Sequence, residues 1–128
     1  MIDHVSVAVS DLDEGTRFYE AVLGVIGYRK LETRGRTVGF GKEYPEFWIN
    51  LRTAMTPVRE DCGAHVGLRA RTAELVDAFH AAALAAGGQS DGAPELRAQH
   101  GQGYYAAFIC DPDGNRIEAV TFLPSNAS

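Results

Sequence analysis

Residues 4–9, His-Val-Ser-Val-Ala-Val, and residues 65–70, His-Val-Gly-Leu-Arg-Ala, decide the fold. Valine at every second place in the first stretch is typical of a half-buried strand. The two stretches lie 61 positions apart, and the same offset matches further residues without a gap. The chain therefore contains a duplication. The other matched pairs are Asp13 with Glu74, Phe18 with Phe79, Ala21 with Ala82, Leu23 with Leu84 and Gly27 with Gly88.

Each half of the chain predicts the order strand, helix and three strands. Ser10 and Asp11 predict the start of the first helix, Thr72 that of the second, and glycines end both. Further strands are expected at 27–32, 36–41 and 46–52 in the first half, and at 89–97, 104–110 and 115–122 in the second. Asp111-Pro112-Asp113-Gly114 predicts a tight turn before the last strand.

The expected architecture is α+β, with two βαβββ modules in a single domain over residues 1–128. The first module covers about 1–56, a linker 57–63, the second module about 64–122, and a frayed tail 123–128. Helices cover only one face of each sheet. Two copies are therefore expected to curl their sheets into a shared open barrel, with the uncovered faces lining a cleft.

Composition narrows the function classes. The chain has 128 residues, 45% hydrophobic and 23% charged, with a net charge of −5. Its basic residues are scattered, which argues against a nucleic-acid partner. No apolar stretch is long enough for a membrane span, and no secretory leader precedes the first strand. Cys62 and Cys110 lack metal-type spacing and are interpreted as structural thiols rather than a disulfide. A cytoplasmic location is expected.

Strand alternation assigns side chains to faces and points to a metal site. If Val5, Val7 and Val9 face the helix, His4 faces the cleft. The same reasoning places His65 and Glu118 on the cleft face. A single strand histidine is more often a structural residue. The duplication, however, places two histidines equivalently, and two histidines with one carboxylate form a common set of ligands for a first-row metal.

The sequence resembles the vicinal-oxygen-chelate superfamily, which includes glyoxalase I, bleomycin-resistance proteins, fosfomycin-resistance enzymes and extradiol dioxygenases. Asp3-His4-Val5, Ala64-His65-Val66 and Asp111-Pro112-Asp113-Gly114-Asn115 followed by Ile117-Glu118 carry the resemblance. It implies paired βαβββ modules and one divalent metal ion, with Fe, Mn, Zn or Ni as candidates. His4, His65 and Glu118 match its ligand positions on the first, fifth and eighth strands. It also allows a homodimer, with modules pairing within or between chains.

Two positions depart from patterns within this superfamily. On the fourth strand, Trp48 stands where glyoxalase I-like enzymes place a carboxylate. A set of three metal ligands with no ligand on the fourth strand resembles that of the extradiol dioxygenases. Those enzymes also carry a histidine before the turn that leads to the last strand, and His100 stands at about that place here. The tyrosine of that set is replaced by Phe108.

The remaining candidates surround the expected cleft. His100 and Tyr104 are candidates for acid–base chemistry, and Glu118 for a base if its bond to the metal is loose. Two functions stay open. One is a metal-dependent lyase, isomerase or dioxygenase-like enzyme that chelates a small substrate through adjacent oxygens. The other is a metal-free drug- or metabolite-binding protein of the bleomycin-resistance type. The candidate substrate-binding residues are Trp48, Asn50, Arg52, Arg69 and Tyr105.

Overall fold

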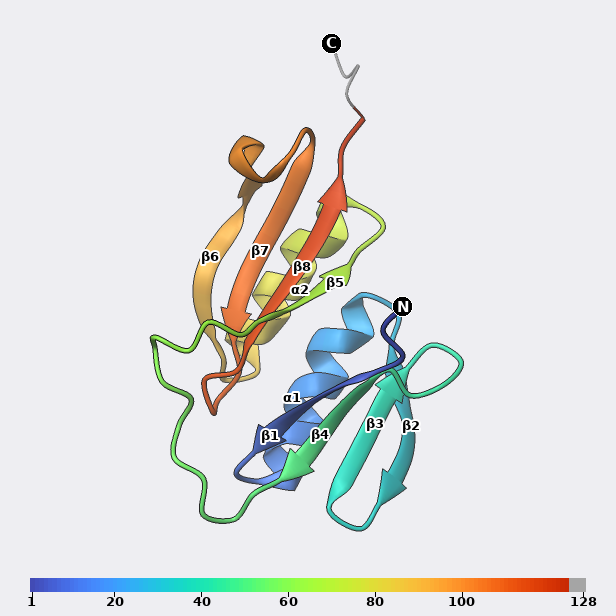
Figure 1. Cartoon of the computed structure of the whole chain (residues 1–128). Coiled ribbons are helices and arrows are strands. Elements are labelled where there is room, and N and C mark those ends of the chain that lie inside the picture. Colours follow the sequence, from blue (N-terminus) through green and yellow to red (C-terminus); the bar gives the residue numbers. More distant parts are fainter. Residues whose placement is uncertain (125–128) are drawn as a thin grey trace.

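The computed structural model describes residues 1–124, and its elements follow the order βαβββ twice (Figure 1). The predicted tail falls mostly on residues 125–128, which lie outside the described residues. The first module contains β1 Val5–Val9, α1 Leu12–Val25, β2 Arg29–Arg34, β3 Thr37–Gly41 and β4 Phe47–Leu51. The second contains β5 Val66–Arg69, α2 Ala73–Ala85, β6 Gln89–Leu96, the 3-10 turn Ala98–His100, β7 Tyr104–Cys110 and β8 Arg116–Phe122.

Each module folds one four-stranded sheet, with strand orders β1-β4-β3-β2 and β5-β8-β7-β6. The first strand of each module pairs in parallel with the last, and the other pairs are antiparallel. This duplicated topology confirms the predicted α+β class of two βαβββ modules. It also leaves β1 and β5 as edge strands of their own sheets.

The two helices begin where capping chemistry predicts. The Asp11 side chain accepts a hydrogen bond from the Glu14 amide, and the Thr72 side chain accepts one from the Leu75 amide. Their apolar sides pack on the sheets, and Phe18 and Phe79, one of the pairs matched by the duplication, are both fully buried. Neither helix within residues 1–124 is long and apolar enough to cross a membrane.

The modules meet through their helices and through the turn before β8. Helices α1 and α2 contact each other behind the two sheets (Figure 1). In the turn, the buried Asp111 carboxylate accepts a hydrogen bond of 2.6 Å from the Tyr19 hydroxyl of α1. The Asn115 side-chain amide of the same turn donates to the Ala8 carbonyl of β1. These bonds fix the second module against the first and leave the other face of each sheet, here called the open face, without a helix.

Candidate metal and ligand site

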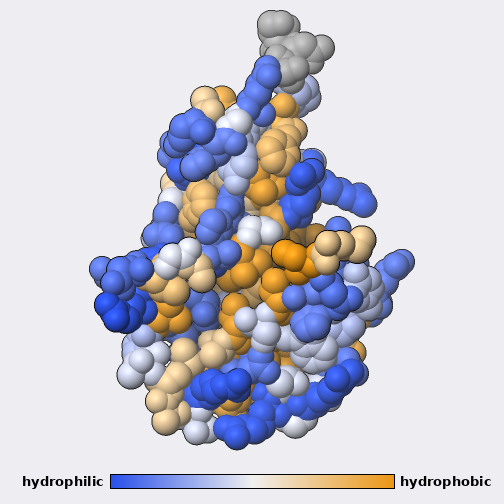
Figure 2. Space-filling model, in the orientation of Figure 1, coloured by the Kyte–Doolittle hydropathy of each residue, from blue (hydrophilic) through white to orange (hydrophobic). Residues whose placement is uncertain are grey.

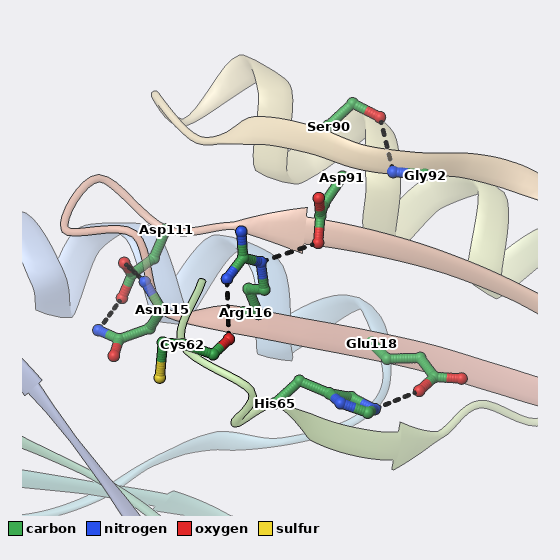
Figure 3. A network of polar contacts seen from close by, with 9 residues as sticks. All are labelled: Cys62, His65, Ser90, Asp91, Gly92, Asp111, Asn115, Arg116 and Glu118. Carbon is green, nitrogen blue, oxygen red and sulfur yellow. Dashed lines mark hydrogen bonds and ion pairs between the residues drawn. The ribbon is translucent and has the colours of Figure 1, made fainter. Parts of the chain in front are cut away.

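His65 and Glu118 form the centre of the candidate site on the open face of the second module. His65 precedes the edge strand β5, and Glu118 lies on the neighbouring β8. The His65 Nε2 and Glu118 Oε1 atoms are 3.0 Å apart (Figure 3). The Glu118 side chain is only 4% exposed although it is a carboxylate. A buried carboxylate is costly unless it is paired, so the contact with His65 stabilises Glu118 in its buried position.

Tyr104 completes the surroundings of Glu118. Its hydroxyl donates a hydrogen bond to Glu118 Oε2, so the two carboxylate oxygens have different partners. Burial, followed by this hydrogen bond, raises the pKa of Tyr104 to about 12. The phenol therefore remains protonated at neutral pH and holds the carboxylate in one orientation.

His4 lies apart from that pair. Its Nδ1 atom is 2.7 Å from Asp3 Oδ1, and its side chain is exposed. His4 and His65 line one pocket of about 310 Å³ between the leading ends of β1 and β5. Within residues 1–124, however, no three His, Cys, Asp or Glu side chains are grouped to hold a metal ion. The expected convergence of His4, His65 and Glu118 within one chain is therefore not found, because helix-to-helix packing of the modules does not turn their open faces toward each other.

Trp48 and Asn50 lie on the open face of the first module, as alternation along β4 predicts. Both line a pocket of about 470 Å³. A Cβ atom at Gly39 would be 2.9 Å from the Trp48 ring, so this glycine makes room for the indole. The Arg34 guanidinium lies over the ring, and the Asn50 amide donates to the Ser6 hydroxyl. An aromatic wall therefore occupies the fourth-strand position.

The other candidates divide between the two faces. The His100 ring is 5.4 Å from that of Tyr104, and the Arg69 guanidinium is 4.6 Å from the Phe122 ring, which places both residues on the open face. Tyr105 does not lie on the open face, because its side chain packs against the core and its hydroxyl donates to Asp77 of α2. Arg52 lines a separate pocket of about 540 Å³, rather than the pocket that contains Trp48.

Sequence reasoning missed two arginines near these faces. Arg34 stacks on Trp48, and Arg97 lies over the ring of Phe108, 4.9 Å from its centroid. Arg97 follows β6, where a basic residue ordinarily indicates only a solvated strand end. No local sequence signal distinguishes this position.

The two cysteines are free thiols, as predicted. Cys62 is exposed in the connection between the modules, and its carbonyl accepts a hydrogen bond from Arg116, which also pairs with Asp91 (Figure 3). Burial raises the pKa of the Cys110 thiol, which therefore remains protonated at neutral pH.

Comparison with known proteins identifies the family. The profile of the Glyoxalase/Bleomycin resistance protein/Dioxygenase superfamily matches residues 1–119. The chain belongs to this superfamily. A glyoxalase/bleomycin resistance protein from Albidiferax ferrireducens T118 has a similar structure, with a TM-score of 0.79 and 32% sequence identity over 92% of this chain and 95% of that chain. A search of curated proteins gives no match.

More distant members of the superfamily share the fold. The fosfomycin resistance protein FosX from Mesorhizobium loti has a TM-score of 0.68 and 19% identity over 94% of this chain and 90% of that chain. A mutant of the genomically encoded FosX from Listeria monocytogenes, in complex with Mn(II) and 1S,2S-dihydroxypropylphosphonic acid, has a TM-score of 0.70 and 18% identity over 96% of this chain and 90% of that chain. At these identities the likeness shows the fold alone.

Proposed function

We propose that this superfamily member is a divalent-metal-dependent enzyme acting on a small substrate that chelates the metal through adjacent oxygens. The reaction class is that of a lyase, isomerase or dioxygenase. The observation that carries the proposal is the His65–Glu118 pair, with its nearly buried carboxylate on the open face of a sheet. Relatives of the same fold include a FosX in complex with Mn(II).

The two side chains fit a metal by the chemistry of their donor atoms. An imidazole nitrogen and a carboxylate oxygen that face each other repel unless a proton or a cation lies between them. Their separation of 3.0 Å also matches two adjacent ligand atoms around a first-row metal, whose bonds to such atoms are about 2.1 Å long. The hydrogen bond from Tyr104 supports Glu118 in the way that outer groups ordinarily orient metal ligands.

We propose that His4 of a second copy supplies the third ligand, in a homodimer. His4 stands in the first module where His65 stands in the second, so a twofold arrangement of open faces brings the two sets together. Apolar residues gather in the middle of the viewed open face, with hydrophilic residues around them (Figure 2). Phe122, which is 47% exposed, and Tyr44, which is 53% exposed, are large side chains that such a partner would cover.

In this proposal a bound metal supplies Lewis acidity that stabilises negative charge on substrate oxygen. The chain's own residues bind and orient. Trp48 provides a rigid aromatic wall for a planar or apolar part of the substrate. The Tyr104 hydroxyl holds a proton at its oxygen beside Glu118, and the exposed His100 stands next to it as a candidate acid or base.

The metal content of protein purified without an affinity tag or chelator tests the proposal. We expect bound Mn(II) or a similar ion in the native protein, and its loss in His65→Ala and Glu118→Gln. His80→Ala is the matched control, because His80 lies on α2 and hydrogen-bonds Ser90 instead. Native protein that binds no first-row metal would contradict the proposal.

The second candidate function is metal-free binding of a drug or metabolite. It is favoured by the Trp48-lined pocket of about 470 Å³, which has an aromatic wall where some relatives carry a metal ligand. Trp48 is the only tryptophan in the chain, so its fluorescence reports this pocket directly. Tight quenching by an aromatic ligand, equal in native protein and His65→Ala, would support binding over catalysis.

A further inference from the structure

Arg97 carries a guanidinium that is fixed in place on the open face of the second module. Its side chain is only 14% exposed. Its Nη2 atom donates to the Ala93 carbonyl at 2.7 Å, and its Nε atom donates to the Ala106 carbonyl at 3.3 Å. Its planar group stacks over the Phe108 ring. Two hydrogen bonds and a ring face hold the cation, so it loses little freedom on binding a ligand.

Irregular pairing between β6 and β7 creates this position. The register shifts between Ser90 and Gly92 and again between Gly92 and Glu95, which alters the regular ladder beside Arg97. A Cβ atom on Gly92 would be 3.0 Å from Arg97 Nη2 and 3.1 Å from the Phe108 ring. Glycine at this point therefore leaves the space that the guanidinium fills.

The charge of Arg97 has no firm partner among residues 1–124. Glu95 is the carboxylate that pairs with it among residues 1–124, at the limiting distance of 4.0 Å, and the Glu95 side chain is 64% exposed. Such a pair is weak. The carbonyls of Ala93 and Ala106 accept hydrogen bonds from Arg97, but they are uncharged and do not neutralise its positive charge. No acceptor in the described part of the chain takes a hydrogen bond from Arg97 Nη1. A largely buried cation in this state is suited to an anion from outside the chain.

The cation shares a row across the sheet with the proposed metal ligands. Glu118 on β8 lies opposite Phe108 on β7, and Phe108 lies opposite Gly92 on β6, beside which the Arg97 guanidinium lies. The His65 ring is 6.0 Å from the Phe108 ring on the other side. Strand spacing puts Glu118 and Arg97 roughly 10 Å apart, with an aromatic platform between them.

We infer that Arg97 is an anion-binding residue and that the substrate carries a carboxylate, phosphonate or phosphate group remote from its chelating oxygens. The anionic group binds Arg97, the middle of the molecule rests on Phe108, and the adjacent oxygens lie at the His65–Glu118 end. The position of the chelating oxygens rests on the proposed function. The binding of an anion by Arg97 does not.

Titration of metal-free protein with methylphosphonate, followed by ³¹P and ¹⁵N NMR, tests this inference. We expect Arg97→Gln to weaken methylphosphonate binding by about tenfold or more, the usual size for a hydrogen bond to a charged group. The neutral dimethyl ester of methylphosphonate should bind equally poorly to both proteins. Arg17→Gln is the matched control, because it removes the same charge from the exposed part of α1 and should leave binding unchanged.

Each outcome bears on the inference. Equal methylphosphonate affinity in native protein and folded Arg97→Gln would overturn it, as would equal binding of the neutral ester and the anion. If Arg97→Gln does not fold, the Arg97 Nε–H signal of native protein, assigned through Arg97→Lys, must shift with methylphosphonate and not with the ester. Methylphosphonate binding that depends on Arg97 in a protein that takes up no metal would support this inference while the proposed function fails. Metal uptake by a protein whose methylphosphonate binding does not depend on Arg97 would support the proposed function and overturn this inference.

Discussion

Tyr19→Phe tests the link between the modules. The Tyr19 side chain is fully buried, and its hydroxyl is one of four hydrogen-bond donors to the buried Asp111 carboxylate. The other three come from the Asp113 amide, the Asn115 amide and the Asn115 side chain, so the carboxylate stays bonded without Tyr19. We expect a loss of about 1.5–2 kcal/mol, the lower part of the range for a hydrogen bond to a charged group. For a chain of this size the thermal midpoint should fall by roughly 5–8 °C.

The same variant should show a defined pH dependence. Burial raises the pKa of Asp111, and hydrogen bonds from Tyr19 and Asn115 oppose this rise. A carboxyl whose pKa is raised on folding contributes stability at low pH that is lost as the pH rises through its folded-state pKa. Removing the Tyr19 hydroxyl raises that pKa further. The destabilisation should therefore be largest at neutral pH and smaller in acid.

Urea unfolding followed by circular dichroism measures both effects. Tyr105→Phe is the matched control, because it removes a hydroxyl bonded to the exposed Asp77 and should cost less than about 1 kcal/mol. Tyr19→Phe that costs no more than Tyr105→Phe at neutral pH would refute the assigned role of the Asp111 network.

Three further changes follow from named contacts. Gly39→Ala should cost about 1–3 kcal/mol and shift the Trp48 emission, because the added Cβ would be 2.9 Å from the indole. Asp11→Ala should cost about 1 kcal/mol in urea unfolding, because the first turn of α1 loses its side-chain cap. The hydrogen bond to Asp77, followed by burial, raises the pKa of Tyr105 to about 12, so stability from Tyr105 should be present below pH about 10 and lost as pH rises toward 12.

Each of these has its own control. Gly24→Ala is the control for Gly39→Ala, because a Cβ at Gly24 meets no atom within 4 Å. Unchanged Trp48 emission in Gly39→Ala would contradict the assigned packing. Asp11→Asn keeps a capping side chain and should retain most of the stability; equal losses in both variants would argue against the cap. For Tyr105, the ionisation of tyrosines at high pH is followed by absorbance. If the native protein and Tyr105→Phe have the same number of tyrosines that ionise near pH 12, the raised pKa of Tyr105 is contradicted.

Most of the fold could be predicted from local patterns. Alternation along residues 4–9 placed β1 to within a residue, because burial of one sheet face imposes a period of two, and the strand expected at 104–110 is β7. Side chains on Asp11 and Thr72 marked the helix starts, because an uncapped first turn is costly. The short 3-10 turn at Ala98–His100 was not predicted, since a glycine-rich segment carries no such period.

The arrangement of the modules could not be predicted in this way. Periodicity assigns a side chain to a face of its own sheet, and it did so correctly for Glu118 and Trp48. Periodicity cannot predict how the sheet of one module is oriented relative to the sheet of the other, because packing between α1 and α2, which are far apart in the sequence, decides this. Periodicity also missed Arg97, because the position of its side chain depends on the irregular pairing of β6 with β7.

Mixing two defective variants tests the central claim most directly. His4→Ala and His65→Ala should each fail to bind Mn(II) when purified alone. If each site takes His4 from one chain and His65 with Glu118 from the other, a mixed dimer formed by unfolding and refolding the two together contains one site with all native ligands. We therefore predict that Mn(II) binding, measured by electron paramagnetic resonance, reappears in the refolded mixture. Mn(II) binding that stays absent from a mixture shown to contain mixed dimers, or that persists in His4→Ala alone, would contradict the claim.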